Sequence, residues 1–378
     1  MTGFMLYQKL NGKWRDDKMS DKYQNTELIP EERAAYLLEE LSLDEKVAQL
    51  NCVFPFDKAS YDFAGINEQT KHGIGQVSTL EMRRMESLDE VVRWQRKVQR
   101  IVMENSPHRI PAIFHMEGLC GAFIQDSTSF PSGIGRGAGW NPKLEEKIAE
   151  IVSRQEAACG ITHVFAPVLD ISRDSRMGRQ GETYGEDPVL TASLGSAYTK
   201  GCQKYETAGR RTESVAKHFL AFHNSAAGIH GANSDTPERL LEEIYGKPAS
   251  ASHHLLTELL REEMGFDGLC VSDYGAINNA FMFQGIGETK EETGLLCLEA
   301  GMDMELPSVE GYGEAFKNLF ASGRADMDIL DRAVKRVLTA KFRMGLFEHP
   351  FALEGEELRR VFMNKKDKEI SLQSAKES

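Results

Sequence analysis

The stretch GLCVSDYG, residues 268–275, follows a strongly helical pattern and decides how the fold is interpreted. Its short apolar run is bounded by glycines, which is typical of a buried parallel strand. Asp273 then lies where such a strand would emerge from a barrel. In (β/α) barrels, the loops at the carboxyl ends of the strands carry the chemistry. A carboxylate at this position is a candidate nucleophile, base, ligand or loop cap.

Further short apolar runs alternate with amphipathic helical patterns along the chain. The candidate strands lie near residues 47–53, 73–77, 111–115, 162–169, 214–219, 268–272 and 301–304. Helix starts are recognisable between them: Ser42 and Glu45 form a capping box, and Asn141-Pro142 combines an N-cap with a first-turn proline. Alternating strands and helices predict a parallel sheet. We therefore expect an α/β fold, specifically a (β/α)8-like TIM barrel.

Composition and charge narrow the class of protein. The 378 residues carry a formal net charge of -13, which argues against nucleic acid or an anionic membrane as the main partner. The N-terminal residues are too polar for a signal peptide, and no apolar stretch approaches the length needed to span a bilayer. The six cysteines are scattered without a CxxC pair. We interpret them as reduced core residues of a cytoplasmic protein.

Polar residues follow several of the apolar runs at their C-terminal ends. They are Glu117, Asp170 with Arg173, Lys217 with His218, and Asp273. In a parallel barrel these ends converge on one face. Cations and carboxylates that meet there would suit a neutral polyhydroxylated ligand, because hydroxyls accept from the cations and donate to the carboxylates. Taken singly, each residue has a plainer interpretation: Lys217 and His218 as a solvated strand end, Glu117 as a helix cap.

Other motifs point less clearly to chemistry. The charged segment 173–188 either folds into an internally paired loop that shapes a site or is simply solvated. The glycine-rich segment 133–139 resembles a nucleotide loop, but no strand directly precedes it. The histidines lack a metal-binding spacing such as HExxH, and nothing identifies a base for Cys120. We therefore predict neither a cofactor nor a metal site.

Taken together, these motifs resemble glycoside hydrolase family 3, the β-glucosidase and β-xylosidase family. The resemblance runs from about Leu41 to the C-terminus. It rests on SLDEKVAQL, IPAIFHMEGLCG, TSFPSGIG, APVLDISRDSRMGRQGETYGEDP, VAKHF, LLTELLREEMGFDGLCVSDYGA, AGMDMELP and KFRMGLFE, in this order. The family implies a TIM-barrel domain that hydrolyses terminal non-reducing β-D-glucosyl or β-D-xylosyl residues with retention of configuration.

The resemblance also implies roles for individual residues. Asp273 corresponds to the nucleophile of the family's SDW or SDY motif. The residues that correspond to glycone ligands are Glu117, Arg173, Lys217 and His218. Tyr274, also expected at the substrate, stands where many members have tryptophan. A retaining glycosidase needs two carboxyl groups about 5 Å apart, one to attack the anomeric carbon and one to act as acid and then base.

Two departures from the family pattern affect these expectations. Segment 246–252 directly follows Glu243-Ile244-Tyr245, where members usually carry a further strand and helix, so we expect a barrel that lacks about one βα unit, strand six. A barrel short of a strand leaves unpaired edges, which predicts low stability, weak or absent activity and self-association. The second domain that supplies the acid/base in many members is also expected to be absent. Glu182, Glu186 and Asp235 are acidic and near loops, but none is assigned, so the acid/base stays unknown.

The leading hypothesis is a family 3 barrel domain over residues 29–348, with a polar arm at 1–28 and a C-terminal segment at 349–378. It would take a small carbohydrate substrate and no nucleic acid, membrane, metal or cofactor. An inactive, shortened glycosidase with at most weak sugar binding is the alternative from another class. A β-N-acetylhexosaminidase of the same family is disfavoured, because the loop LAFHNSAAGIHG lacks the proline-glycine turn of that branch.

Overall fold

The computed structural model describes residues 22–55, 63–229 and 249–378. Its centre is a parallel sheet with the strand order β1-β2-β3-β4-β5. The strands are β1 Cys52–Val53, β2 Gln76–Ser78, β3 Ile113–Met116, β4 His163–Val164 and β5 Glu213–Ser214. The order in the sheet equals the order in the chain, as expected for a barrel built from successive βα units.

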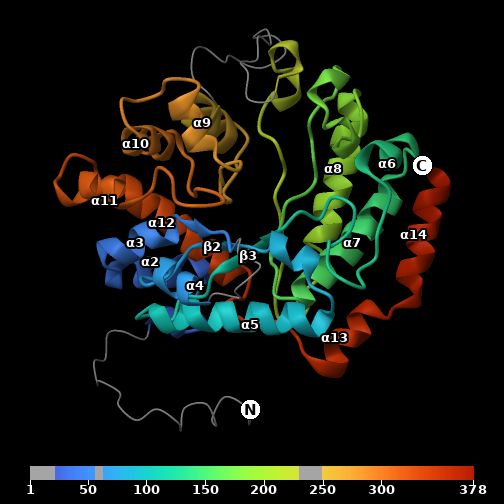
Figure 1. Cartoon of the computed structure of the whole chain (residues 1–378), viewed down its shortest axis with the longest axis horizontal. Helices are drawn as coiled ribbons and strands as arrows, with labels where there is room; N and C mark the ends of the chain where they lie inside the picture. Colours follow the sequence, from blue (N-terminus) through green and yellow to red (C-terminus); the bar gives the residue numbers. More distant parts are fainter. Residues whose placement is uncertain (1–21, 56–62, 230–248) are drawn as a thin grey trace.

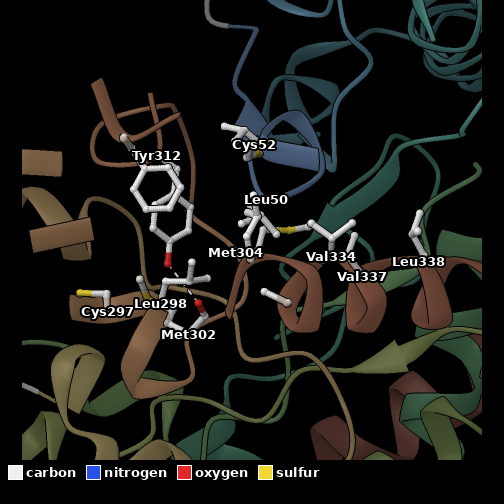
Figure 2. Packing of buried hydrophobic residues seen from close by; sticks show 14 of the residues in the cluster. Leu50, Cys52, Cys297, Leu298, Met302, Met304, Tyr312, Val334, Val337 and Leu338 are labelled. Atoms are coloured by element: carbon white, nitrogen blue, oxygen red, sulfur yellow. Dashed lines mark hydrogen bonds between the residues drawn. The ribbon is translucent and has the colours of Figure 1, made fainter. Parts of the chain in front are cut away.

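Two further apolar runs, residues 268–272 and 301–304, belong to the barrel without forming full strands. Val271 and Met304 form an isolated parallel bridge, and Ser272 N–H donates to the Met304 carbonyl at 2.9 Å. Glu305 N–H donates to the Leu50 carbonyl at 2.9 Å, which joins the last run to the first. Leu50 and Met304 belong to the largest core cluster, which Figure 2 shows from close by.

Among the described residues, the strand pairing is interrupted between β5 and residues 268–272. The described part of the chain contains no strand between them, and no backbone hydrogen bond crosses from one to the other. Val215 and Leu269 nevertheless pack on the same core cluster from the two sides of this seam. The fold of the described residues is therefore of the (β/α)8 barrel type, as predicted, whereas the missing strand six stays a prediction. Segment 230–248, where the departure from the family pattern falls, lies outside the described residues.

Helices cover the outside of the barrel (Figure 1). The α-helices are α2 Pro30–Glu40, α3 Leu43–Gln49, α4 Phe63–Gln69, α5 Leu88–Asn105, α6 Gly133–Ala138, α7 Pro142–Ala158, α8 Pro188–Cys202, α9 Ala276–Met282, α10 Lys290–Ala300, α11 Glu314–Ala321, α12 Met327–Arg343, α13 Gly355–Phe362 and α14 Lys365–Glu377. The π-helix η9 spans His254–Glu263, and the 3₁₀ turns are η1 Lys22–Gln24, η2 Leu80–Arg84, η3 Ser175–Met177, η4 Gln180–Glu182, η5 Phe222–Asn224, η6 Ala226–Gly228 and η8 Ala249–Ala251. α7 and α8 lie side by side, and α14 packs against α7 (Figure 1).

The predicted helix starts are confirmed by their capping contacts. Ser42 Oγ accepts from Glu45 N–H, and the Glu45 carboxylate accepts from Ser42 N–H in return. Asn141 Oδ1 accepts from Leu144 N–H at the start of α7. The candidate strand near residues 47–53 is mostly wrong, because α3 continues to Gln49 and only the last two residues of that run pair as β1.

All six cysteines are unpaired, as expected, and four of them are buried. Within the described ranges, no helix combines the length and the apolar character that a bilayer span requires.

Candidate active site

The centre of the candidate site is an ion pair between two strand ends. Glu117 follows β3, and Lys217 lies beyond β5, where it bridges to Val168. Lys217 Nζ donates to Glu117 Oε2 at 2.5 Å, and the two side chains are only 13% and 24% exposed. The predicted meeting of these two residues at the carboxyl ends of the strands is confirmed. The pair presents one cation and one carboxylate to any ligand above the barrel.

His218, next to Lys217, is held by a buried carboxylate. Its Nδ1 lies 2.7 Å from Asp170 Oδ2, and Asp170 is 5% exposed. A carboxylate accepts hydrogen bonds, so His218 carries its proton on Nδ1 and, when the ring is neutral, offers Nε2 as an acceptor. Arg179 Nη2 approaches this Nε2 at 3.5 Å. The Phe222 ring lies 4.2 Å from the His218 ring and 5.0 Å from the Arg179 guanidinium.

Arg179 is an arginine that the sequence analysis did not single out. Its guanidinium donates to both oxygens of Glu182, at 2.7 and 2.8 Å. Burial alone would raise the pKa of Glu182, but the hydrogen bonds and charge of Arg179 hold it below its usual value. Glu182 is therefore ionised and poorly suited to donate a proton. Arg173, the predicted glycone ligand, is exposed and makes no hydrogen bond or ion pair to the other candidates within the described residues.

The glycine-rich segment 133–139 helps to place Glu182 and forms no nucleotide loop. Most of it is the short helix α6, which packs on the backbone of residues 182–184. A Cβ atom at Gly133 would lie 2.2 Å from the Glu182 carbonyl oxygen, and one at Gly137 would lie 2.1 Å from that of Tyr184. Only glycine permits this close approach of the two backbones.

Asp273 lies between the apolar run 268–272 and the start of α9 at Ala276. Its side chain is exposed, and Tyr274 N–H donates to its Oδ1 at 2.7 Å. Gly275 follows with φ +72°, and its N–H donates to the Leu306 carbonyl at 2.9 Å, which fixes the turn. Hydrogen bonding to Glu182 raises the pKa of Arg179, with smaller contributions from the charges of Asp273 and Glu117. Asp273 therefore lies within electrostatic range of the paired charges.

Tyr274 turns inward from the same loop. Its Oη lies 2.7 Å from His115 Nε2 and 3.3 Å from Ser78 Oγ, and its ring lies 6.1 Å from that of Phe54. Burial raises the pKa of Tyr274, and the charges of Glu117 and Asp273 raise it further. The hydroxyl is therefore neutral.

Two of the acid/base candidates from the sequence remain. Glu186 is exposed, and Asp235 lies outside the described residues. Within the described ranges, no three His, Cys, Asp or Glu side chains are grouped so as to hold a metal ion. The candidate site thus combines paired charges with an exposed carboxylate, which suits a neutral polar ligand.

The chain is similar to known proteins of one enzyme family. The family model described as the glycosyl hydrolase family 3 N terminal domain matches residues 42–248 and 240–340. The periplasmic β-glucosidase of Salmonella typhimurium is 30% identical over 358 residues, which are 87% of this chain and 45% of that protein. A β-xylosidase of Formosa agariphila is 32% identical over 278 residues, which are 63% of this chain and 38% of that protein.

Solved structures give the same result. A β-glucosidase from Erythrobacter marinus superimposes with a TM-score of 0.86 at 29% identity, over 95% of this chain and 51% of that one. A β-glucosidase from Listeria innocua gives a TM-score of 0.80 at 26% identity, over 92% and 51% of the two chains. The chain thus spans about half the length, or less, of these relatives. On the sequence matches and the shared fold, the chain belongs to glycosyl hydrolase family 3 and corresponds to the N-terminal domain of that family.

Proposed function

We propose that the chain is the barrel domain of a retaining β-glycosidase that acts on terminal β-D-glucosyl or β-D-xylosyl residues. The observation that carries the proposal is the convergence of Glu117, Lys217 and His218 on one rim of the barrel, with the exposed carboxylate of Asp273 in the same electrostatic neighbourhood. The names of the relatives support the choice of glycone, and the Listeria innocua relative has been solved in complex with glucose.

In this proposal Asp273 attacks the anomeric carbon, and the bond from that carbon to the leaving oxygen breaks. Nucleophilic attack requires the carboxylate form of Asp273. The Glu117 carboxylate accepts from sugar hydroxyls, and Lys217 donates to them, so the pair exchanges its internal hydrogen bond for bonds to the ligand. Water then releases the sugar from Asp273, and the anomeric configuration is retained.

A second candidate is a sugar-binding barrel without turnover of unactivated substrates. The specific observation in its favour is the state of Glu182, a carboxylate of the charge cluster, which is locked in an ion pair with Arg179 and cannot readily supply a proton. Leaving groups separate the two candidates. A dinitrophenolate departs without a proton, whereas an alkoxide needs one. Turnover of the dinitrophenyl glucoside but not of the methyl glucoside would mean that no acid operates in this chain.

The experiment compares turnover of aryl β-glucosides and β-xylosides by the full chain, by Asp273→Ala and by Asp267→Ala. Asp267 is the matched control, because it lies just before the same run, is exposed and pairs with Arg343. We expect Asp273→Ala to lower kcat/KM at least about 10³-fold and the control to leave it unchanged. Azide should restore turnover of Asp273→Ala and give the glycosyl azide of inverted configuration, because it attacks from the vacated side. Normal activity of Asp273→Ala would refute the assignment.

A further inference from the structure

Inside the barrel, four polar side chains lie together across neighbouring strands. His115 on β3 pairs in register with His163 on β4, which pairs with Glu213 on β5. Gln76, on β2, lies two residues before Ser78, the register partner of His115, and so faces the same side of the sheet. Gln76 and His115 are wholly buried, His163 is 2% exposed, and the Glu213 side chain is 27% exposed.

These side chains form a continuous hydrogen-bonded chain that ends at the candidate active site. Glu213 Oε2 lies 3.3 Å from His163 Nε2, and His163 Nδ1 lies 3.3 Å from Gln76 Nε2. The same Gln76 nitrogen lies 2.7 Å from His115 Nδ1, and His115 Nε2 lies 2.7 Å from Tyr274 Oη. Phe165 stacks on the His115 ring at 4.3 Å with an interplanar angle of 10°, which holds the ring in place.

The Glu213 carboxylate determines which group donates and which accepts in every bond of this hydrogen-bonded chain. A carboxylate only accepts, so His163 must carry a proton on Nε2, and its Nδ1 in the neutral ring is an acceptor. Gln76 must then turn its NH₂ group toward His163, and its second N–H donates to His115 Nδ1. His115 in turn carries its proton on Nε2 and donates it to Tyr274 Oη. The tyrosine oxygen is thereby an acceptor on its inner side, and its own proton points elsewhere.

We propose that Glu213, acting through His163, Gln76 and His115, fixes the Tyr274 hydroxyl as a hydrogen-bond donor directed into the sugar site beside Asp273. The assignment of that site rests on the proposed function. The four inner residues are positioning residues, because they reach the ligand only through Tyr274. The hydroxyl also lies 3.3 Å from Ser78 Oγ, a long contact that a hydrogen bond to a sugar oxygen or to the Asp273 carboxylate can replace.

Two observations support this direction over the reverse one. The reverse chain would place an unprotonated Nε2 of a neutral His163 against the Glu213 carboxylate, two acceptors facing each other at 3.3 Å. It would otherwise need a charged His163 in a buried position. Burial also lowers the pKa of His115 well below its usual value, which keeps that ring neutral with one proton to place. Because a neutral His115 has one donor and one acceptor nitrogen, the hydrogen-bonded chain runs in a single direction through it.

The test reads the tautomers directly, in the full chain and without ligand. Histidine labelled with nitrogen-15 in both ring positions gives long-range proton–nitrogen spectra that separate protonated from bare ring nitrogens. His115→Gln and His163→Gln assign the two signals. We expect both rings to be protonated at Nε2 and bare at Nδ1. A proton on His115 Nδ1, or a doubly protonated His163 at neutral pH, would overturn the proposal.

A conservative variant tests whether Glu213 sets the direction. The amide in Glu213→Gln can present either its oxygen or its NH₂ group, so a population of His115 protonated at Nδ1 should appear. Glu206→Gln is the matched control, because this exposed glutamate lies in the loop before β5 and pairs only with Arg211 among the described residues. It should leave both tautomers unchanged. An unaltered His115 tautomer in Glu213→Gln would refute the role of Glu213.

Ligand binding supplies the functional readout. Gluconolactone, titrated calorimetrically, should bind about 3- to 10-fold more weakly to Tyr274→Phe, which lacks the donor. Glu213→Gln should weaken binding in the same direction, and Glu206→Gln should not. Equal affinity of Tyr274→Phe and the unaltered chain would overturn the donor role. Failure of the unaltered chain to bind gluconolactone would contradict the proposed function. The tautomers of His115 and His163 test the hydrogen-bonded chain separately, because they are measured without ligand.

Discussion

Glu156, on α7, gives the sharpest stability prediction. Its carboxyl group is wholly buried, and neither oxygen has a hydrogen-bond partner among the described residues. Burial raises the pKa of Glu156 well above its usual value of 4.5, and the charge of Glu117 raises it further. The folded chain therefore keeps this proton at pH values at which the unfolded chain releases it.

The sign of the pH dependence follows from this difference. Above pH 4.5 the folded state binds one more proton than the unfolded state, so the free energy of unfolding decreases as the pH rises toward the folded-state pKa. The loss is about 1.4 kcal/mol per pH unit for one proton. Glu156→Gln keeps the shape of the side chain but cannot titrate. As the pH rises, the free energy of unfolding of the variant should therefore increase relative to that of the unaltered chain by about 1.4 kcal/mol per pH unit.

The assay is urea unfolding at a series of pH values from about 5 upward. The slope against pH is the test, because the buried amide of the variant also lacks partners and adds a pH-independent cost of about 1–3 kcal/mol. Glu150→Gln, on the same helix, is the control: its carboxylate accepts from Lys204 at 2.5 Å and is partly exposed, so no comparable slope is expected. A flat difference for Glu156→Gln would refute the reasoning, since it would mean that the buried carboxyl is ionised in the folded chain.

Three further predictions concern the barrel and its rim. Asp303→Ala should destabilise the chain by about 3–5 kcal/mol in urea unfolding, because the buried carboxylate pairs with two arginines at 2.7 and 2.8 Å; a loss under about 1 kcal/mol would contradict this. Asp170→Asn should weaken gluconolactone binding about 3- to 10-fold in calorimetry, because its amide no longer fixes the proton of His218 on Nδ1; unchanged affinity would show that the tautomer is irrelevant. Arg179→Lys should weaken the same binding about 10-fold, because lysine cannot pair with both oxygens of Glu182; an equal affinity would exclude this arginine from the site.

Much of the fold was predictable, because local chemistry decides it. The capping box of Ser42 and Glu45 and the N-cap at Asn141 act within a few residues, and both form as expected. The positions of the barrel runs also follow from their apolar character. The extent of strand pairing does not, since it depends on neighbours far along the chain. The run near residues 47–53 illustrates this, because helix formation by α3 takes most of it.

The candidate site was predictable in part. Glu117 and Lys217 meet because each ends a strand, and parallel strands end on one rim. The sequence pattern could not show which of Arg173 and Arg179 turns toward His218. The 3₁₀ turns η3, between the two arginines, and η4, after Arg179, decide this. Glu182, three residues after Arg179 and paired with it, was the feature of the sequence that could have identified Arg179 as the arginine that turns toward His218.

The hydrogen-bonded chain inside the barrel was harder to predict from the sequence. His115, His163 and Glu213 each lie in or beside an apolar run, where a polar side chain needs a partner. Their shared register is set by the pairing of β3, β4 and β5, which no local motif encodes. Three polar residues at corresponding places in successive runs are therefore the pattern to look for in other barrels.

The most direct test of the central claim is covalent labelling of the full chain with a 2-deoxy-2-fluoro-β-glucoside that carries a dinitrophenolate leaving group. The fluorine slows release of the sugar, and the leaving group needs no proton, so the result does not depend on an acid elsewhere. The account predicts one fluoroglucosyl group per chain, on the peptide that contains Asp273, and none on Asp273→Ala. Labelling of another carboxylate, with Asp273→Ala still labelled to the same extent, would contradict it.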